Sequence, residues 1–379
     1  MSAESTPGPG IPGESGISTP RHRAKGRRRK PRGGHRKGLM VMAWTAAGIV
    51  VLGGTGAGYL YFKLNGNIKS VDIDQALGTD RPEKVDNGSE NILVLGSDTR
   101  SGSNKKLGGG TDDGSARSDT AMIVHVYEGH KKASVVSIPR DTIIDRPECV
   151  DTQGDDHPAA NGVMFNSAYS TGGAACAVKT VESMTGVRMD HYLEVDFSGF
   201  QKLIDELGGV EVTTTKNIDD PDSHLELQAG THRLDGEQAL GLVRTRHGVG
   251  DGSDLGRIQL QQAFIKALVN QVKEVGIFTS PKKLYDLADT ATRTVTTDSD
   301  LGSVNALMSF ANGLKGITPK NMHMVTMPVQ YDPADPNRVI VQKAKAQLVW
   351  DALKNDRPIP KAATEGTATG EAKGVVTSQ

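Results

Sequence analysis

Cysteine is scarce in this chain of 379 residues, which contains only Cys149 and Cys176. Neither belongs to a CxxC motif or to a Cys/His spacing, so the usual cysteine-rich zinc sites are excluded. In a reducing cytosol the two thiols would pack as small apolar groups, whereas outside the membrane such a pair typically forms a disulfide. Because the segment that contains them is predicted below to lie outside, we expect a Cys149–Cys176 bridge.

Common catalytic signatures are also missing. The sequence has no HExxH zinc motif and no GxxxxGK[ST] phosphate loop. Its histidines, such as His191, His232 and His247, have no evident serine or cysteine partner in the sequence. Zinc proteases and P-loop NTPases are therefore not indicated, and charged loop residues become the candidates for function.

Acidic charge is almost absent from the first 37 positions, which contain ten Lys or Arg residues against Glu4 and Glu14 only. The formal net charge of -1 hides this asymmetry, because 34 basic and 43 acidic residues follow position 37. A body this acidic is a poor general binder of nucleic acid, so no nucleic-acid partner is expected. Residues 1–37, rich in Pro, Gly, Ser and Arg, are predicted to be a disordered basic tail.

Residues 38–62 contain no charged side chain and are long enough to span a bilayer as one helix. The basic run before them places residues 1–37 in the cytoplasm and the rest of the chain outside. A cleaved signal peptide is the alternative, but this apolar run is longer than the usual signal core. We therefore expect a single-pass membrane protein with an extracytoplasmic domain.

The remainder of the chain predicts a single α/β domain. Runs rich in apolar and β-branched residues predict strands at 91–95, 121–127, 133–138, 191–197, 210–212 and 322–328. Helices are expected after Asp235, after Asp254 and over residues 343–353, with each Asp as a cap. We expect a linker and domain entry at 63–89, the α/β domain at 90–355 and a disordered tail at 356–379.

Charged residues follow or precede three of these predicted strands. Asp98, Asp119 and the pair Arg140-Asp141 lie at such positions. Ligands collect at strand ends in open α/β sheets, and loop carboxylates suit Mg²⁺. Taken singly, each Asp is equally typical of a turn or a cap.

A second group of charged residues is Arg244, Arg246, Arg257 and Gln261. Arg257 and Gln261 are four residues apart in a predicted helix, so they share a face. Converging guanidinium forks suit a pyrophosphate. A solvated arginine face with surface ion pairs explains the spacing equally well.

Around these residues the chain resembles the LytR-CpsA-Psr family. The matching blocks are NILVLGSDTR (91–100), RSDTAMIVHV (117–126), SIPRDT (137–142), FNSAYSTGG (165–173), TGVRMDHYLEVDFSGFQKLIDELGGVEV (185–212) and LDGEQALGLVRTRHGVGDGSDLGRIQLQQ (234–262). They occur in the family's order and cover most of residues 90–265.

The resemblance implies a domain with a central mixed β-sheet flanked by helices, in which an apolar tunnel holds a polyprenyl chain. Asp98 and Asp119 would serve a Mg²⁺ site, and Asp98 would accept the acceptor's proton. Asp141 would support the catalytic Arg140. The pyrophosphate would be bound by Arg140, Arg244, Arg246, Arg257 and Gln261. The implied reaction transfers a glycan phosphate from a polyprenyl-pyrophosphate carrier to a peptidoglycan hydroxyl and releases polyprenyl phosphate.

Two departures from the family pattern stand out. The Gly- and Asp-rich loop at 101–116 separates the two metal-site carboxylates, and Leu260 stands where many relatives have Arg. Two other functions use the same features. One is a lipid pyrophosphatase with water as nucleophile, and the other is a non-catalytic regulator or glycopolymer-binding protein.

Overall fold

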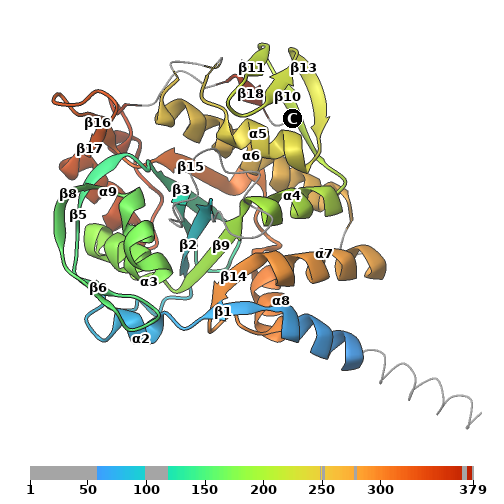
Figure 1. Cartoon of the computed structure of the whole chain (residues 1–379), viewed down its shortest axis with the longest axis horizontal. Coiled ribbons are helices and arrows are strands. Elements are labelled where there is room, and N and C mark those ends of the chain that lie inside the picture. Colours follow the sequence, from blue (N-terminus) through green and yellow to red (C-terminus); the bar gives the residue numbers. More distant parts are fainter. Residues whose placement is uncertain are drawn as a thin grey trace, which may run out of the picture. The chain divides into compact units, whose positions relative to one another are not determined.

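The computed structural model describes residues 58–98, 118–247, 249, 252–276, 280–368 and 374–377. The chain divides into Met1–Ala57 and Gly58–Gln379, and all the described residues belong to the second unit. A seven-stranded sheet with the order β1-β14-β9-β2-β3-β4-β15 runs through it (Figure 1). Its strands are β1 (Lys69–Val71), β2 (Glu90–Ser97), β3 (Ser118–Val126), β4 (Ala133–Ile138), β9 (His191–Asp196), β14 (Val295–Asp298) and β15 (Met322–Thr326).

This sheet is mixed, as predicted, because β2 pairs antiparallel with β3 and parallel with β9. Alternation along β2 sends Leu93 and Leu95 to one face and Ile92 and Val94 to the other. The first face packs against α3 (Asn166–Thr185) and α9 (Lys343–Lys354) in the largest core. The second face is covered by α6 (Asp254–Glu274) and α8 (Val304–Leu314), and several of its apolar side chains stay partly exposed.

Shorter elements surround the central sheet. A four-stranded sheet contains β16 (Val329–Tyr331), β17 (Val339–Val341), β5 (Thr142–Arg146) and β8 (Ala160–Met164). The remaining strands are β6 (Cys149–Val150) with β7 (Asp156–His157), β11 (Ile218–Asp220) with β12 (Leu225–Leu227), and β10 (Val210–Thr214) between β13 (Gly230–Leu234) and β18 (Val376–Thr377). The remaining helical elements are α2 (Asp74–Leu77), α4 (Phe197–Glu206), α5 (Gly236–Arg244), α7 (Pro281–Thr294), η3 (Pro319–Asn321) and η4 (Lys361–Ala363). A second core forms between β10, β13, α5 and α6.

Residues 63–89, predicted to be a linker and domain entry, pack into the domain over much of their length. Their β1 pairs in parallel with β14 at the edge of the central sheet. Arg81 also forms a buried ion pair with Glu182 of α3 at 2.7 Å. The prediction missed this because three-residue strands carry little periodic signal.

The prediction that residues 356–379 form a disordered tail is wrong for those of them that the structure describes. Ile359 and Ala363 are buried in the main core, and β18 pairs with β10 while burying Val375 and Val376. Low overall hydrophobicity suggested disorder, yet the few apolar residues of this segment are the ones that pack. The described part of the tail therefore belongs to the fold.

Most of the predicted membrane helix at 38–62 lies outside the described residues. Its described part, residues 58–62, belongs to a helical segment that continues to residue 67. Across the described ranges, no helix combines the length and the hydropathy required to cross a bilayer.

Candidate active site

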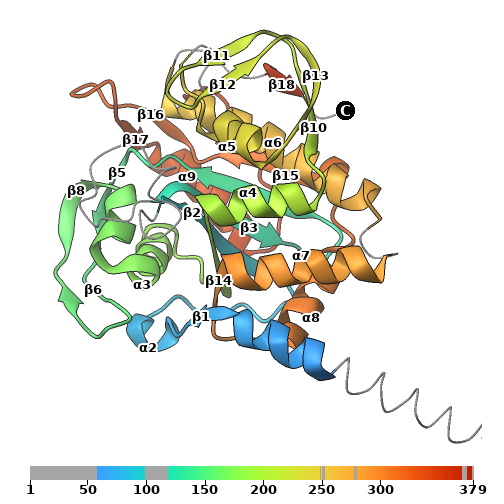
Figure 2. The same ribbon diagram turned by 45° about the vertical axis from the view of Figure 1, so that its right-hand side comes forward.

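The candidate site forms where β2 ends and β3 begins. The ladder pairs Ser97 with Ser118, which brings Asp98 and Asp119 to adjacent strand ends. Helices α5 and α6 lie side by side next to this part of the sheet (Figure 2). A cavity of about 180 Å³ opens here, and its lining includes Asp119, Arg140, Arg244, Arg246, Arg257 and Gln261. Asp119 and Arg140 of the first cluster therefore meet the second cluster in one cavity, whereas Asp98 and Asp141 are not among its lining residues.

Asp254 is the carboxylate around which the arginines gather. Its Oδ1 lies 3.1 Å from Arg246 Nη2 and 3.7 Å from Arg140 Nε, and it forms an ion pair with Arg257. The sequence predicted Asp254 to be a helix cap, but Ser253 caps α6 by accepting the Gly256 N–H at 3.2 Å. Asp254 is therefore available to the guanidinium groups, and its spacing of three from Arg257 is the sequence signal that could have revealed this role.

Asp119 is a second anchor for the arginines. Arg140 donates to its carboxylate, and Arg257 Nη2 donates to its backbone carbonyl at 2.9 Å. Burial alone would raise the pKa of the Asp119 carboxyl, but the charges of Arg140 and Arg257 outweigh burial and lower that pKa. Asp119 is therefore ionised at neutral pH and is suited to hold a cation.

The guanidinium groups are crowded. Burial, followed by the charges of Arg257 and Arg140, lowers the pKa of Arg246. Arginine stays protonated at neutral pH even so, which means that the site concentrates positive charge. Among the described residues, the buried Nε atoms of Arg140 and Arg257 have no hydrogen-bond partner. An anion with several oxygens would satisfy both donors.

Arg244 and Gln261 line the same cavity with different contacts. The Arg244 guanidinium lies over the Phe197 ring, 4.9 Å from its centroid. The amide nitrogen of Gln261 donates to Thr120 Oγ1 at 3.0 Å and to the Val243 carbonyl at 2.9 Å. Gln261 therefore ties α6 to β3 and α5, and its amide donors already have partners in the protein.

Asp141 supports Arg140 from the side. Arg140 Nε lies 3.5 Å from Asp141 Oδ1. Burial, followed by the charge of Asp254, raises the pKa of Asp141. Asp141 therefore lies within ion-pair distance of the guanidinium of Arg140.

Two tyrosines bind Glu194 next to Asp98, which is itself only 8% exposed. Tyr169 Oη donates to Glu194 Oε1 at 2.5 Å, and the buried Tyr192 donates to Oε2. Burial and then the charge of Glu194 raise the pKa of Tyr169, whose hydroxyl also bonds Ser97. Glu194 was not among the predicted site residues, because a carboxylate in the middle of a strand gives no motif.

We expect Tyr169→Phe to lower the free energy of unfolding by about 1.5 kcal/mol, because one hydrogen bond to a charged group is lost. Chemical denaturation of the full chain measures the change. Tyr59→Phe is the control, since the Tyr59 side chain is 69% exposed. Equal stability of the two variants would show that the Tyr169 hydroxyl contributes nothing.

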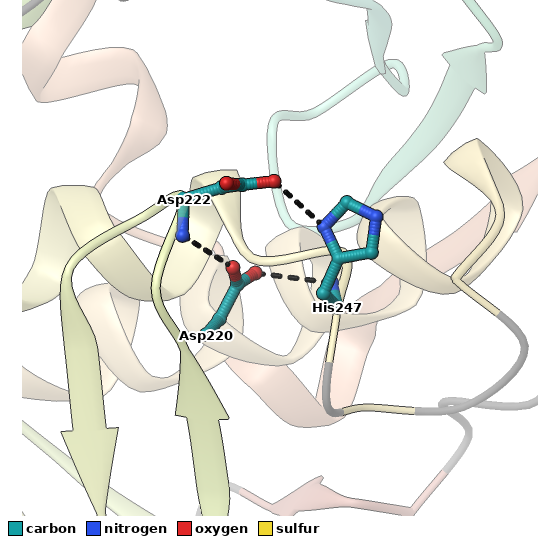
Figure 3. Close-up of side chains that lie close together, drawn as sticks. All are labelled: Asp220, Asp222 and His247. Atoms are coloured by element: carbon teal, nitrogen blue, oxygen red, sulfur yellow. Dashed lines mark hydrogen bonds and ion pairs between the residues drawn. The ribbon is translucent and has the colours of Figure 1, made fainter.

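Asp220, Asp222 and His247 lie together near the site and have the composition of a metal centre (Figure 3). Both carboxylate oxygens of Asp220 are already engaged, however. Its Oδ1 accepts the Asp222 N–H at 3.0 Å, and its Oδ2 accepts those of Arg246 and His247 at 2.8 and 3.0 Å. Asp222 and His247, 3.0 Å apart, are both exposed. The cluster thus fixes the backbone that carries Arg246 and offers too few ligands for a metal site.

The predicted disulfide is confirmed. Cys149 of β6 and Cys176 of α3 are bonded, 27 residues apart in sequence. Helix α3 is interrupted at Gly172 and Gly173, and a Cβ at Gly172 would lie 2.3 Å from Cys176 Sγ. The bridge therefore braces the helix that also supplies Tyr169.

Known proteins show what this chain is similar to. It is 30% identical over 343 residues to the Bacillus subtilis polyisoprenyl-teichoic acid--peptidoglycan teichoic acid transferase TagT, covering 88% of this chain and 98% of TagT. It is 32% identical over 323 residues to the Corynebacterium glutamicum cell wall biosynthesis protein LcpA, covering 78% of this chain but only 60% of the length of LcpA. A solved structure of TagT bound to LI-WTA matches with a TM-score of 0.54 and 27% identity, over 76% of this chain and 98% of that chain. Since the LytR_cpsA_psr family matches residues 60–355, the chain belongs to the LytR-CpsA-Psr family.

Proposed function

We propose that this chain is a phosphotransferase that moves a glycopolymer from a polyprenyl-pyrophosphate carrier to peptidoglycan and releases polyprenyl phosphate. The observation that carries the proposal is the convergence of Arg140, Arg246 and Arg257 on Asp254, with two buried Nε donors that have no hydrogen-bond partner among the described residues. Two linked phosphates present oxygens on several sides, which converging guanidinium forks can bind. The names of TagT and LcpA support transfer to the cell wall.

An apolar surface beside the site supports a lipid carrier. Val94, Val124 and Leu193 lie on the sheet face beneath α6, and Ile265 and Val269 of α6 pack toward them. All five side chains are partly rather than fully buried. Lipid and cofactor sites are lined mainly by apolar side chains, with a few polar groups that fix the orientation. An isoprenoid chain on this face would leave its pyrophosphate at the arginines.

The donor carries its own activated phosphoanhydride, so the transfer needs no nucleotide. The acceptor oxygen bonds to the phosphorus that carries the glycan while the phosphoanhydride bond breaks, and polyprenyl phosphate leaves. Arg140, Arg246 and Arg257 stabilise the charge that develops on these oxygens. We assign the acceptor's proton to Asp98, while Asp141 holds Arg140 in place.

Mg²⁺ fits the oxygen donors beside the arginines. Asp119 is ionised, Asp98 lies at the adjacent strand end, and the buried Oδ2 of Asp254 has no hydrogen-bond partner among the described residues. These are the hard oxygen ligands that Mg²⁺ prefers. Bound there, the ion would supply charge neutralisation to the phosphates.

We also propose a single-pass membrane location, with the amino terminus in the cytoplasm and the catalytic domain outside. The basic run followed by the charge-free residues 38–62 supports this orientation. The Cys149–Cys176 disulfide is typical of an oxidising compartment.

A transfer assay with the full chain tests the function. A lipid-pyrophosphate-linked radiolabelled glycan is incubated with insoluble peptidoglycan and Mg²⁺, and the control omits peptidoglycan. We expect the label on peptidoglycan, its loss with EDTA and its recovery with excess Mg²⁺. Label that appears only in solution would identify a lipid pyrophosphatase. No turnover of the donor at all would favour a regulator or a glycopolymer-binding protein.

A further inference from the structure

Several large apolar side chains are exposed on three neighbouring helical segments. Tyr59, Leu60, Tyr61 and Phe62 belong to the helical residues 58–67, Leu284 to α7 and Met308 to α8. These three helices lie side by side in both ribbon views (Figures 1 and 2). We call this surface, formed by residues 58–67, α7 and α8, the α7–α8 face. Exposed apolar groups gathered in this way mark a contact surface.

Polar contacts hold residues 58–67 against the other two helices. Lys63 Nζ donates to Tyr285 Oη at 2.8 Å and lies 3.3 Å from Asp289 Oδ1. The Val304 N–H donates to Asn65 Oδ1 at 3.2 Å. The helical segment that contains Phe62 is therefore held against α7 and α8.

Helix α8 is apolar on two sides. It has no charged residue from Val304 to Leu314. Phe310 and Leu314 pack against the partly exposed sheet face, whereas Met308 is 55% exposed to solvent. The helix thus separates the apolar sheet face from the surroundings.

Exposed lysines occur on or next to the same helices, and one of them, Lys282, is ion-paired with Asp286. Lys282 and Lys283 stand in the first turn of α7, and Lys315 follows α8. Lys131 and Lys132 are exposed in the β3–β4 turn, against which the end of α8 packs through Gly316. Aromatic and apolar groups with lysines around them are typical of surfaces at the lipid headgroups.

Helix α8 and the arginine cluster lie at opposite ends of β2. The first part of β2 pairs with His191, the first residue of β9. The His191 ring lies 3.3 Å from the carboxylate of Asp298, and the chain runs from Asp298 through a turn into α8. Strand β2 ends at Ser97, just before Asp98. At the usual rise per residue its eight residues span roughly 25 Å. The apolar sheet face therefore connects α8 with the proposed pyrophosphate site.

We infer that the α7–α8 face docks on the lipid bilayer and that the isoprenoid tail of the carrier passes from the bilayer onto the apolar sheet face at α8. The inference rests on the proposed function and on the proposed membrane anchor. A bilayer is the occupant that fits, because the charge-free residues 38–62 end within the helical segment that is fixed to α7 and α8. The lysines complement anionic headgroups.

Single-cysteine labelling of the full chain in anionic lipid vesicles tests the docking. The two native cysteines are bonded to each other, so Leu284→Cys and Met308→Cys each supply one reactive thiol. Leu348→Cys in α9 is the matched control, because Leu348 is 41% exposed and Leu284 is 39% exposed. A polarity-sensitive dye at 284 and 308 is expected to shift its emission to the blue and to be quenched by nitroxide lipids, unlike the dye at 348. Equal solvent exposure at the three positions would overturn the docking.

Donors of two lengths test the path of the tail. Met308→Asp is expected to lower turnover of a long-chain donor in vesicles about tenfold, which corresponds to roughly 1.4 kcal/mol. Turnover of a short-chain, water-soluble donor should stay unchanged, and Leu348→Asp should change neither. Equal losses on both donors would contradict entry at α8. A wild-type chain that is inactive on both donors would refute the proposed function, while the dye labels would still report on docking.

Discussion

Arg140→Lys is expected to slow glycopolymer transfer by about 10²- to 10³-fold, the usual cost of removing one donor that stabilises transition-state charge. Lysine keeps a positive charge near Asp119, whose carboxylate is paired with Arg140. It cannot reproduce the planar fork that binds two oxygens at once, and it removes the buried Nε that has no hydrogen-bond partner within the described residues. The transfer rate should therefore fall strongly, whereas the free energy of unfolding should change little.

Initial transfer rates at saturating donor and thermal unfolding are measured on the same preparation. Arg233→Lys is the matched control, because Arg233 is exposed and only loosely paired with Glu211 at 3.4 Å. Its rate should equal that of the wild type. If Arg140→Lys were folded and as active as this control, the pyrophosphate would have to be bound by other residues.

The strand ends explain why much of the site could be predicted from sequence. Asp98, Asp119 and Arg140 follow or precede apolar runs, and residues at neighbouring strand ends converge once the strands pair. Arg246 and Arg257 could be grouped because they flank one predicted helix start. Their approach to Asp119 could not be predicted from the sequence, because Arg257 and the Asp119 carbonyl that it donates to are 138 positions apart in the chain.

Two site residues were assigned wrongly or missed because the sequence around them gives an ambiguous pattern or none. Asp254 looked like a cap because a carboxylate before an apolar periodic run usually is one, but the neighbouring Ser253 caps the helix. Glu194 lies within a strand, and only the three-dimensional structure shows Tyr169 and Tyr192 donating to it. Such cooperation between distant side chains leaves no local pattern.

The structure explains why Leu260 stands where many relatives have Arg. An arginine at this position would have suggested one more basic contact in the site. In the structure Leu260 is 1% exposed and belongs to the second core with Phe264 and Val212. The position therefore contributes to packing in this chain, and the proposed anion site depends on the arginines that line the cavity.

Replacing Cys149 and Cys176 with alanine is expected to lower the free energy of unfolding by about 3.5 kcal/mol. The bridge closes a loop of 27 residues, and its removal gives the unfolded chain more conformations. Both sulfurs are buried, so alanine is preferred to serine, which would bury an unpaired hydroxyl. Chemical denaturation under non-reducing conditions measures the change.

Cys176→Ala alone separates the cross-link from side-chain packing. If the cross-link is the cause, the single variant should lose nearly as much stability as the double variant, and reductant should bring the wild type close to both. An unchanged wild-type midpoint under reductant that breaks the bond would contradict this explanation. Because the bridge braces the helix that supplies Tyr169, the loss should also appear as earlier thermal inactivation of transfer, with little change in rate at low temperature.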